Sequence, residues 1–174
     1  MEGYHKQKLV INGIYHKPVL LIEVLESLGV EVGKWYIDAT LGDGGHALEI
    51  LKRGGNIIGF DVDPDALEIA SFRFKGSGFD SSRFKLIQGN FRNLKSEQTE
   101  KAGKIKAVIF DLGVSSRELG DPGRGFSFQK NGPLDMRMDP TLQVTAEVLI
   151  NGLTKGELNE LFTSLGEEKL ARRF

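Results

Sequence analysis

The sequence predicts an α/β protein with an open, doubly wound sheet of the Rossmann-like type. Short apolar and β-branched runs alternate with helical spacing, and a glycine-rich turn follows the first of these runs. The expected strands are residues 35–40, 56–61, 84–87 and 107–110. Because runs that are apolar on both faces are typical of buried parallel strands, we expect a parallel sheet with right-handed crossovers.

The helices between these strands have their own signals. After Gly45, apolar residues recur at helical spacing until Gly54–Gly55. Asp63 and Pro64 form an N-cap and first-turn pair ahead of a further helix. We expect the strands in the order third, second, first, fourth. The fourth strand then lies at an open hydrophobic edge, so we expect the chain to form a homo-oligomer or to be poorly stable.

The periodicity divides the chain into three parts. Residues 1–113 contain the predicted sheet. Residues 114–140 are rich in Gly and Pro and show no clear period, which is typical of a functional loop, and we interpret them as an active-site and substrate loop. Residues 141–174 return to helical spacing without another strand, and we interpret them as the beginning of a helical substrate-recognition domain.

Composition excludes several classes of site. The 174 residues contain no Cys, which rules out disulfides, thiolate zinc sites and Cys nucleophiles. His5, His16 and His46 lack the spacing of a metal site, so no metal is expected. Since there is no long apolar run and no signal-like N-terminus, we expect a cytoplasmic protein without a membrane segment.

Formal charge is nearly balanced overall, with 23 basic and 24 acidic residues, but it is uneven along the chain. Between Ser71 and Ile109 nine basic residues face three acidic ones, a local surplus of +6. Such a surplus can face a polyanion or lie on solvated surfaces, and both interpretations remain open. The basic residues are Arg73, Lys75, Arg83, Lys85, Arg92, Lys95, Lys101, Lys104 and Lys106, and the acidic ones are Asp80, Glu97 and Glu100.

The glycine turn, Gly42 to His46, predicts a nucleotide-type cofactor site. A strand that leads through glycines into a helix brings backbone N–H groups close to a ligand, and we expect Gly44 and Gly45 to leave no Cβ in its way. Asp61 ends the second strand, where a carboxylate accepts hydrogen bonds from ribose hydroxyls. The alternative to a cofactor site is a glycine turn whose only role is to let the helix pack against the strand.

The residues leave the identity of the cofactor open between a dinucleotide and S-adenosylmethionine, since Gly42-x-Gly44-x-x-Ala47 also fits the dinucleotide pattern. Asp38 and Asp43 favour the cationic S-adenosylmethionine over a pyrophosphate. Phe91, just past the third strand, would supply an aromatic face for adenine, although it fits a core position equally well.

Two further stretches carry candidate chemistry. Asp111 follows the fourth strand and is expected at the same crevice as Asp61, either holding a ligand amine or capping the next helix. Asp111 and Ser115 are the candidate catalytic residues. In the following loop, aromatic and arginine side chains can clamp a splayed base and its phosphates, or the loop is closed by internal ion pairs. These substrate candidates are Arg124, Phe126, Phe128 and Arg137.

Five segments together resemble the MraW family, the small-subunit ribosomal RNA methyltransferases H. They are His16–Leu21, Asp38–His46, Asp111–Ser116, Arg124–Phe128 and Pro133–Asp139. The resemblance implies S-adenosylmethionine-dependent methylation of a cytidine N4 in the decoding region of small-subunit rRNA. It implies cofactor contacts at Gly44, Gly45, His46, Asp61, Phe91, Asp111 and Glu118.

Two departures from the family pattern are visible. Glu118 stands where the family usually has Gln, and a carboxylate accepts hydrogen bonds but does not donate them. The family also continues past Gly166–Glu168, so the resemblance implies that this chain is the N-terminal part of such an enzyme. The alternatives are a catalytically incomplete fragment that binds the cofactor or RNA, and an NAD-binding oxidoreductase.

Overall fold

The computed structural model describes residues 18–95, 99 and 102–173, so His5, His16, Glu97, Glu100 and Lys101 lie outside the described residues. The chain divides into two compact units, with the boundary between Ser115 and Ser116, and each unit is described by itself. The first unit contains the sheet and the second contains only helices and turns among its described residues.

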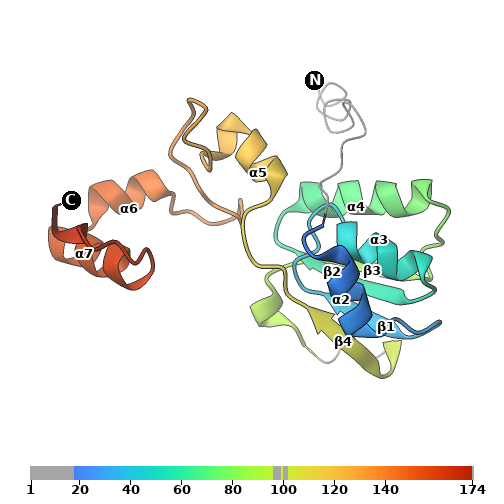
Figure 1. The fold of residues 1–174 in the computed structure, drawn as a ribbon. Helices are drawn as coiled ribbons and strands as arrows, with labels where there is room; N and C mark the ends of the chain where they lie inside the picture. The colour runs from blue at the N-terminus through green and yellow to red at the C-terminus, as the bar shows by residue number, and fades with distance from the viewer. Residues whose placement is uncertain (1–17, 96–98, 100–101, 174) are drawn as a thin grey trace, which may run out of the picture. The chain divides into compact units, whose positions relative to one another are not determined.

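The first unit is built on a four-stranded parallel sheet (Figure 1). Its strands are β1 (Trp35–Asp38), β2 (Asn56–Asp61), β3 (Phe84–Gln88) and β4 (Ile105–Ile109). Their order is β3-β2-β1-β4, which confirms the predicted order. In the register, Asp38 at the end of β1 lies between Gly59 and Ile109, so the carboxyl ends of β2, β1 and β4 lie along one edge. The candidate site lies at this edge of the sheet.

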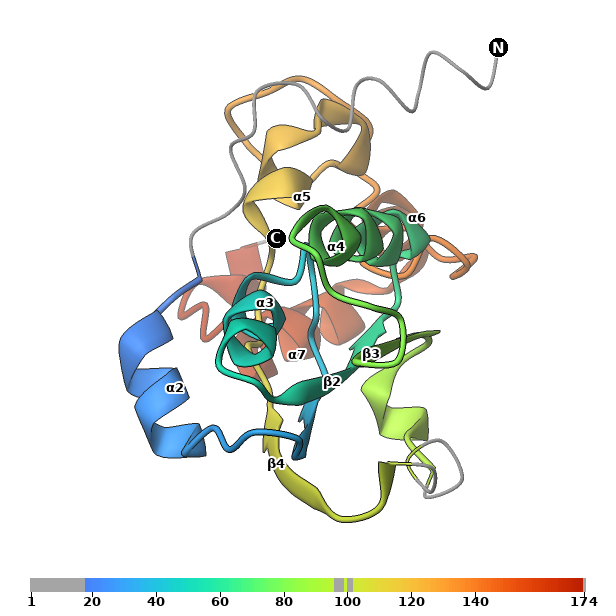
Figure 2. The same cartoon turned by 90° about the vertical axis from the view of Figure 1, so that its right-hand side faces the viewer.

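Three helices pack on one face of this sheet, as Figure 2 shows for α3 and α4 above β2. They are α2 (Leu21–Leu28), α3 (Gly45–Lys52) and α4 (Pro64–Gly76). Asp63 caps α4 by accepting the N–H of Asp65 at 2.9 Å, with Pro64 in the first turn, which confirms the predicted start. Helix α2 was not predicted, although its apolar residues recur at i, i+3, i+4 and i+7.

The core lies mainly between the helices and the sheet. Tyr36, Ile57 and Phe74 are completely buried there, and Phe74 meets Phe84 edge to face at 5.2 Å. A smaller cluster covers the opposite face, where Ile37, Ala39, Ile58 and Phe60 pack with Ala102 of the β3–β4 connection. That connection also contains the 3-10 turn η1 (Phe91–Asn93).

The second unit consists of short elements. They are α5 (Ser116–Gly120), η4 (Pro122–Arg124), α6 (Ala146–Gly152), α7 (Lys155–Ser164) and η5 (Ala171–Arg173). Helix α5 and turn η4 fall inside the 114–140 stretch that showed no period, because elements of three to five residues are too short to display one. Helices α6 and α7 confirm the helical spacing predicted after Thr145, and Thr154 and Glu157 form a capping box at the start of α7.

Candidate functional site

Three aspartates gather at the carboxyl edge of the sheet, one from each of three neighbouring strands. Asp61 ends β2, Asp38 ends β1, and Asp111 follows β4 by two residues. The negative charges of Asp111 and Asp61 both contribute to raising the pKa of Asp38, so the three carboxyl groups are electrostatically close. The predicted placement of Asp61 and Asp111 at the same edge is therefore confirmed by the strand order.

Asp38 is the buried member of the three, with 2 % of its surface exposed. Burial raises the pKa of its carboxyl from the ordinary 3.8 to about 7, against the opposing hydrogen bond from the Thr40 N–H at 3.2 Å. Asp43 contacts the Arg73 guanidinium, whose Nη1 lies 3.4 Å from Oδ1. The negative charge expected beside the turn is therefore smaller than that of two free carboxylates, since Asp38 is only partly ionised at neutral pH and the charge of Asp43 is paired with that of Arg73.

The glycine turn is joined directly to the end of β2. The Gly42 N–H donates to Asp61 Oδ2 at 2.8 Å, and the Asp63 N–H donates to Asp61 Oδ1 at 2.9 Å. Asp61 thus holds the turn on one side and the start of α4 on the other. A carboxylate offers about four lone-pair sites, so these two bonds do not exhaust its capacity to accept ribose hydroxyls.

The reason for glycine at two positions of the turn differs from the predicted one. A Cβ on Gly44, whose φ is +77°, would lie 2.7 Å from the Phe74 ring, and a Cβ on Gly45 would collide with Pro18. These glycines are needed for packing inside the first unit rather than for clearance toward a ligand. At Gly42, by contrast, no heavy atom lies within 4 Å of the Cβ position. The open face of the turn is therefore at Gly42.

Asp111 is positioned by two groups of the same unit. Its backbone N–H donates to Thr40 Oγ1 at 2.7 Å, and its carboxylate Oδ2 lies 3.8 Å from His46 Nδ1. The His46 ring is buried, and its Nε2 lies 3.0 Å from the Val19 carbonyl, which only accepts hydrogen bonds, so Nε2 carries the proton. The Asp111 side chain stays 45 % exposed.

Phe91 lies on η1, and its ring is partly exposed. It meets the Phe110 ring edge to face, with 5.4 Å between the ring centroids. Phe110 lies between the end of β4 and Asp111, and sequence reasoning missed it as a site residue. The two rings form an apolar surface beside the carboxylates, and only the β-branched run that ends at Phe110 hinted at it.

The candidates of the second unit are held mostly by one another. The buried Glu118 carboxylate lies 3.5 Å from Arg124 Nη2, and that nitrogen also donates to the Arg137 and Met138 carbonyls. Arg137 forms a 2.7 Å ion pair with Asp135 that lowers the pKa of this carboxyl to about 2. For Arg124 and Arg137 the structure therefore agrees with the second interpretation of this loop, in which internal ion pairs close it.

The aromatic candidates of this loop differ in exposure. The Cζ atom of Arg124 lies over the Phe126 ring, 6.0 Å from the ring centroid. The Phe128 side chain is 100 % exposed. Ser115 lies at the last position of the first unit. Phe128 is the substrate candidate whose side chain is presented to solvent.

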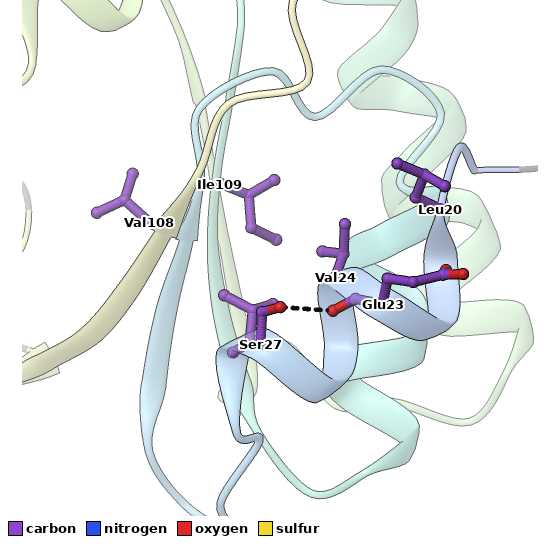
Figure 3. Close-up of a pocket in the computed structure, with 7 residues that line it drawn as sticks. Leu20, Glu23, Val24, Ser27, Val108 and Ile109 are labelled. Atoms are coloured by element: carbon purple, nitrogen blue, oxygen red, sulfur yellow. Dashed lines mark hydrogen bonds between the residues drawn. The ribbon is translucent and has the colours of Figure 1, made fainter.

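Two pockets are lined by none of the candidate site residues. One, of about 370 Å³, lies between α2 and β4 (Figure 3) and is lined mainly by apolar side chains such as Val24 and Ile109. The other, of about 350 Å³, lies at the amino ends of β1 and β4. In the part of the chain that the structure describes, no group of His and acidic residues could hold a metal ion, and no helix is long and apolar enough to cross a membrane.

A parallel sheet with a glycine turn and carboxylates along its carboxyl edge defines the class of Rossmann-like proteins, which bind ligands outside the carboxyl ends of their strands. A sequence profile described as the MraW methylase family matches residues 13–174, and the chain belongs to this family.

The chain is similar to curated proteins named ribosomal RNA small subunit methyltransferase H. It is 45% identical over 159 residues to the one from Carboxydothermus hydrogenoformans, covering 90% of this chain and 50% of that protein. It is 39% identical over 163 residues to one from Coxiella burnetii, covering 91% of this chain and 52% of that protein. The chain therefore spans about half the length of the curated relatives it matches.

Solved structures are more distantly similar. The C-terminal domain of precorrin-6Y C5,15-methyltransferase from Rhodobacter capsulatus matches with a TM-score of 0.47 and 22% identity, covering 61% of this chain and 55% of that one. An RNA methyltransferase from Salinibacter ruber in complex with S-adenosyl-L-homocysteine matches with a TM-score of 0.42 and 21% identity, covering 47% of this chain and 53% of that one.

Proposed function

We propose that this chain is the cofactor-binding and catalytic part of a methyltransferase that acts on small-subunit rRNA. Membership of the MraW methylase family carries this proposal. The names of the relatives support small-subunit rRNA as the substrate. From the resemblance of the motifs, the proposed reaction is transfer of a methyl group from S-adenosylmethionine to N4 of a cytidine in the decoding region. The protein would then act in the cytoplasm, with the small ribosomal subunit as its partner.

The residues of the carboxyl edge fit this cofactor chemically. The Asp61 carboxylate suits ribose hydroxyls, and the open turn at Gly42 admits a ligand close to the backbone. The partly exposed ring of Phe91 with Phe110 suits an adenine. When bound, the cofactor supplies a methyl group on a sulfonium. We assign the backbone of Gly44, Gly45 and His46 to the same site. Glu118, in the second unit, stays a cofactor contact that only the family resemblance implies.

Asp111 has the central role in the proposed mechanism. The lone pair of cytosine N4 is delocalised into the ring, so the amine is a weak nucleophile. An acceptor at the end of β4, either the Asp111 carboxylate or the Leu112 carbonyl, holds one N4 proton and frees the lone pair. On methylation N4 would lose one proton, and the role of an adjacent carboxylate would be to accept it. Thr40 holds the Asp111 backbone during this alignment.

The exposed loop residues are proposed to hold the substrate. Phe128 is free of packing and offers a face on which an unpaired base can stack. Phe126 is already stacked under Arg124, so it would supply an edge of the same platform. Arg137, bound to Asp135, orders the loop. Ser115, next to the loop, is the second candidate for a contact with the reacting base.

Cofactor identity is tested by calorimetric titration of this chain with S-adenosylhomocysteine and with NAD. We expect S-adenosylhomocysteine to bind and NAD not to bind. Asp61→Asn should weaken binding by about tenfold or more, because hydrogen bonds to a charged group contribute about 1.5–3 kcal/mol. Glu68→Gln, an exposed change on α4, is the matched control and should leave binding unchanged. Binding of NAD alone would replace the proposal by the oxidoreductase alternative.

The reaction is tested in a full-length relative, by methyl incorporation into small ribosomal subunits. Changing the residue that corresponds to Asp111 to Asn should reduce turnover, with general-base assistance accounting for at most about 10²–10⁴-fold. Undiminished turnover removes Asp111 from the mechanism. Analysis of the modified nucleoside then decides whether N4 of cytidine carries the methyl group.

A further inference from the structure

Two arginines of the basic stretch between Ser71 and Ile109 bind groups inside the first unit. Arg73 Nη1 donates to the Asp43 carbonyl at 3.2 Å, and Arg83 donates to the Gly55 carbonyl at 2.7 Å and to the Asn56 side chain. These two arginines tie the first unit together internally. By contrast, Lys104 and Lys106 at the end of the stretch lie in a pocket with Glu31 and Lys34, from a distant part of the chain.

Three lysines line the pocket of about 350 Å³ at the amino ends of β1 and β4, together with Glu31 and Ile105. Trp35 of β1 pairs with Ile105 of β4, so Lys34 and Lys104, which precede these residues, come to the mouth of the same hollow. Lys106 follows on β4. The pocket is therefore assembled by the register of two adjacent strands and not by sequence proximity.

The charge of this pocket is positive after internal pairing. Lys106 Nζ lies 2.6 Å from Glu31 Oε1, and this pair lowers the pKa of Glu31 and raises that of Lys106, so both stay charged at neutral pH. Lys34 also lowers the pKa of Glu31 by its charge but forms no salt bridge with a described residue, and neither does Lys104. Three ammonium groups against one carboxylate leave a surplus of two positive charges.

We propose that this lysine pocket, formed by Glu31, Lys34, Lys104, Ile105 and Lys106, binds a backbone phosphate of the substrate RNA. The proposal rests on the proposed function, which supplies the RNA. Lysine binds phosphate as a point charge, and no aromatic side chain lines the pocket to stack a base. A contact of this kind positions the RNA and carries no sequence preference.

The location of the pocket allows the phosphate contact to orient the RNA relative to the reacting base. The pocket lies at the opposite end of β1 and β4 from Asp111: Ile105, which lines the pocket, is separated from Ile109 by about 13 Å at about 3.3 Å per residue, and Asp111 follows two residues later. An RNA segment that reaches both ends of β4 would be held at two points, at the reacting base and at the lysine pocket. Two-point attachment fixes the orientation of a long polyanion better than either contact alone.

The test is RNA binding by this chain, measured by fluorescence anisotropy with a labelled fragment of small-subunit rRNA at several salt concentrations. The variant is Lys34→Glu with Lys104→Glu. The matched control is Lys75→Glu with Lys155→Glu, which changes the net charge equally at two exposed positions outside the pocket. Inorganic phosphate is titrated separately into the unmodified chain and the pocket variant.

We expect the pocket variant to lose roughly tenfold or more in affinity at 0.1 M salt, with the slope of log affinity against log salt reduced by about 1 to 2. The control should change affinity by less than about threefold. Equal losses in both variants, unchanged binding in the pocket variant, or no RNA binding by the unmodified chain would each overturn the proposal. The proposal would also be overturned if the pocket variant lost binding of inorganic phosphate but kept its RNA affinity. Titration with S-adenosylhomocysteine in the same variants separates these outcomes from a failure of the proposed function.

Discussion

Asp38 should make the stability of the first unit depend on pH, with a sign opposite to that of an ordinary surface carboxylate. Its pKa is raised from 3.8 to about 7 in the folded chain, chiefly by burial, with smaller contributions from the charges of Asp111 and Asp61. Below pH 3.8 the carboxyl is protonated in both states. As the pH rises from there, the unfolded chain loses this proton first, so the free energy of unfolding falls until the pH passes about 7.

The size of the effect follows from these two pKa values. They differ by about three pH units, each worth about 1.36 kcal/mol, so Asp38 should lower the free energy of unfolding by about 4 kcal/mol between pH 4 and pH 8. Asp38→Asn keeps the size of the side chain and an oxygen that accepts the Thr40 N–H, and it removes the titration. The variant should therefore gain about 4 kcal/mol relative to the unmodified chain over this range.

The assay is urea denaturation of both proteins at pH 4, 5, 6, 7 and 8, followed by circular dichroism. Comparing the two proteins at each pH cancels the titration of all other groups. Glu68→Gln, at an exposed position of α4, is the control and should follow the unmodified chain throughout. Parallel curves for Asp38→Asn and the unmodified chain would refute the reasoning, because they would mean that this carboxyl ionises alike in both states.

Three further substitutions test the packing, the positioning and the substrate loop. Gly44→Ala should lower the free energy of unfolding by about 1–3 kcal/mol in urea denaturation, because the new Cβ enters the Phe74 ring at a φ of +77°; an unchanged midpoint would contradict this packing. Thr40→Val should cost about 0.5–1.5 kcal/mol in the same assay, because the Asp111 N–H loses its side-chain acceptor, whereas Thr40→Ser should restore it. Phe128→Ala should change stability by no more than about 0.5 kcal/mol, since the ring is fully exposed, but should weaken binding of single-stranded RNA by about 1–3 kcal/mol; equal RNA binding would remove Phe128 from the proposed platform.

The strands and their order were predictable because each carries its own local pattern. The runs at 35–40 and 56–61 are apolar on both faces, and the connections between strands obey a fixed handedness. Boundaries were less accurate, and β4 begins at Ile105, two residues before the predicted start. Helix α2 was not predicted, because its eight residues make only about two turns and so give a short periodic pattern.

The candidate site was predictable in position but not in its electrostatics. Strand ends of a parallel sheet meet along one edge, so Asp61 and Asp111 were expected near each other, and the strand order places them there. That Asp43 is paired with Arg73, or that Phe110 packs on Phe91, depends on residues 30 and 19 positions apart in the chain. No local pattern reports such contacts.

The sequence by itself determined the parallel sheet, its strand order, the cap of α4 and the family, because all of these depend on residue types at short spacings. The tertiary structure decided which carboxylate is buried and holds its proton, which glycines are needed for packing, and which lysines gather at one pocket. Burial and the distances between charges arise only when segments such as those carrying Lys34 and Lys104 are brought side by side by strand pairing.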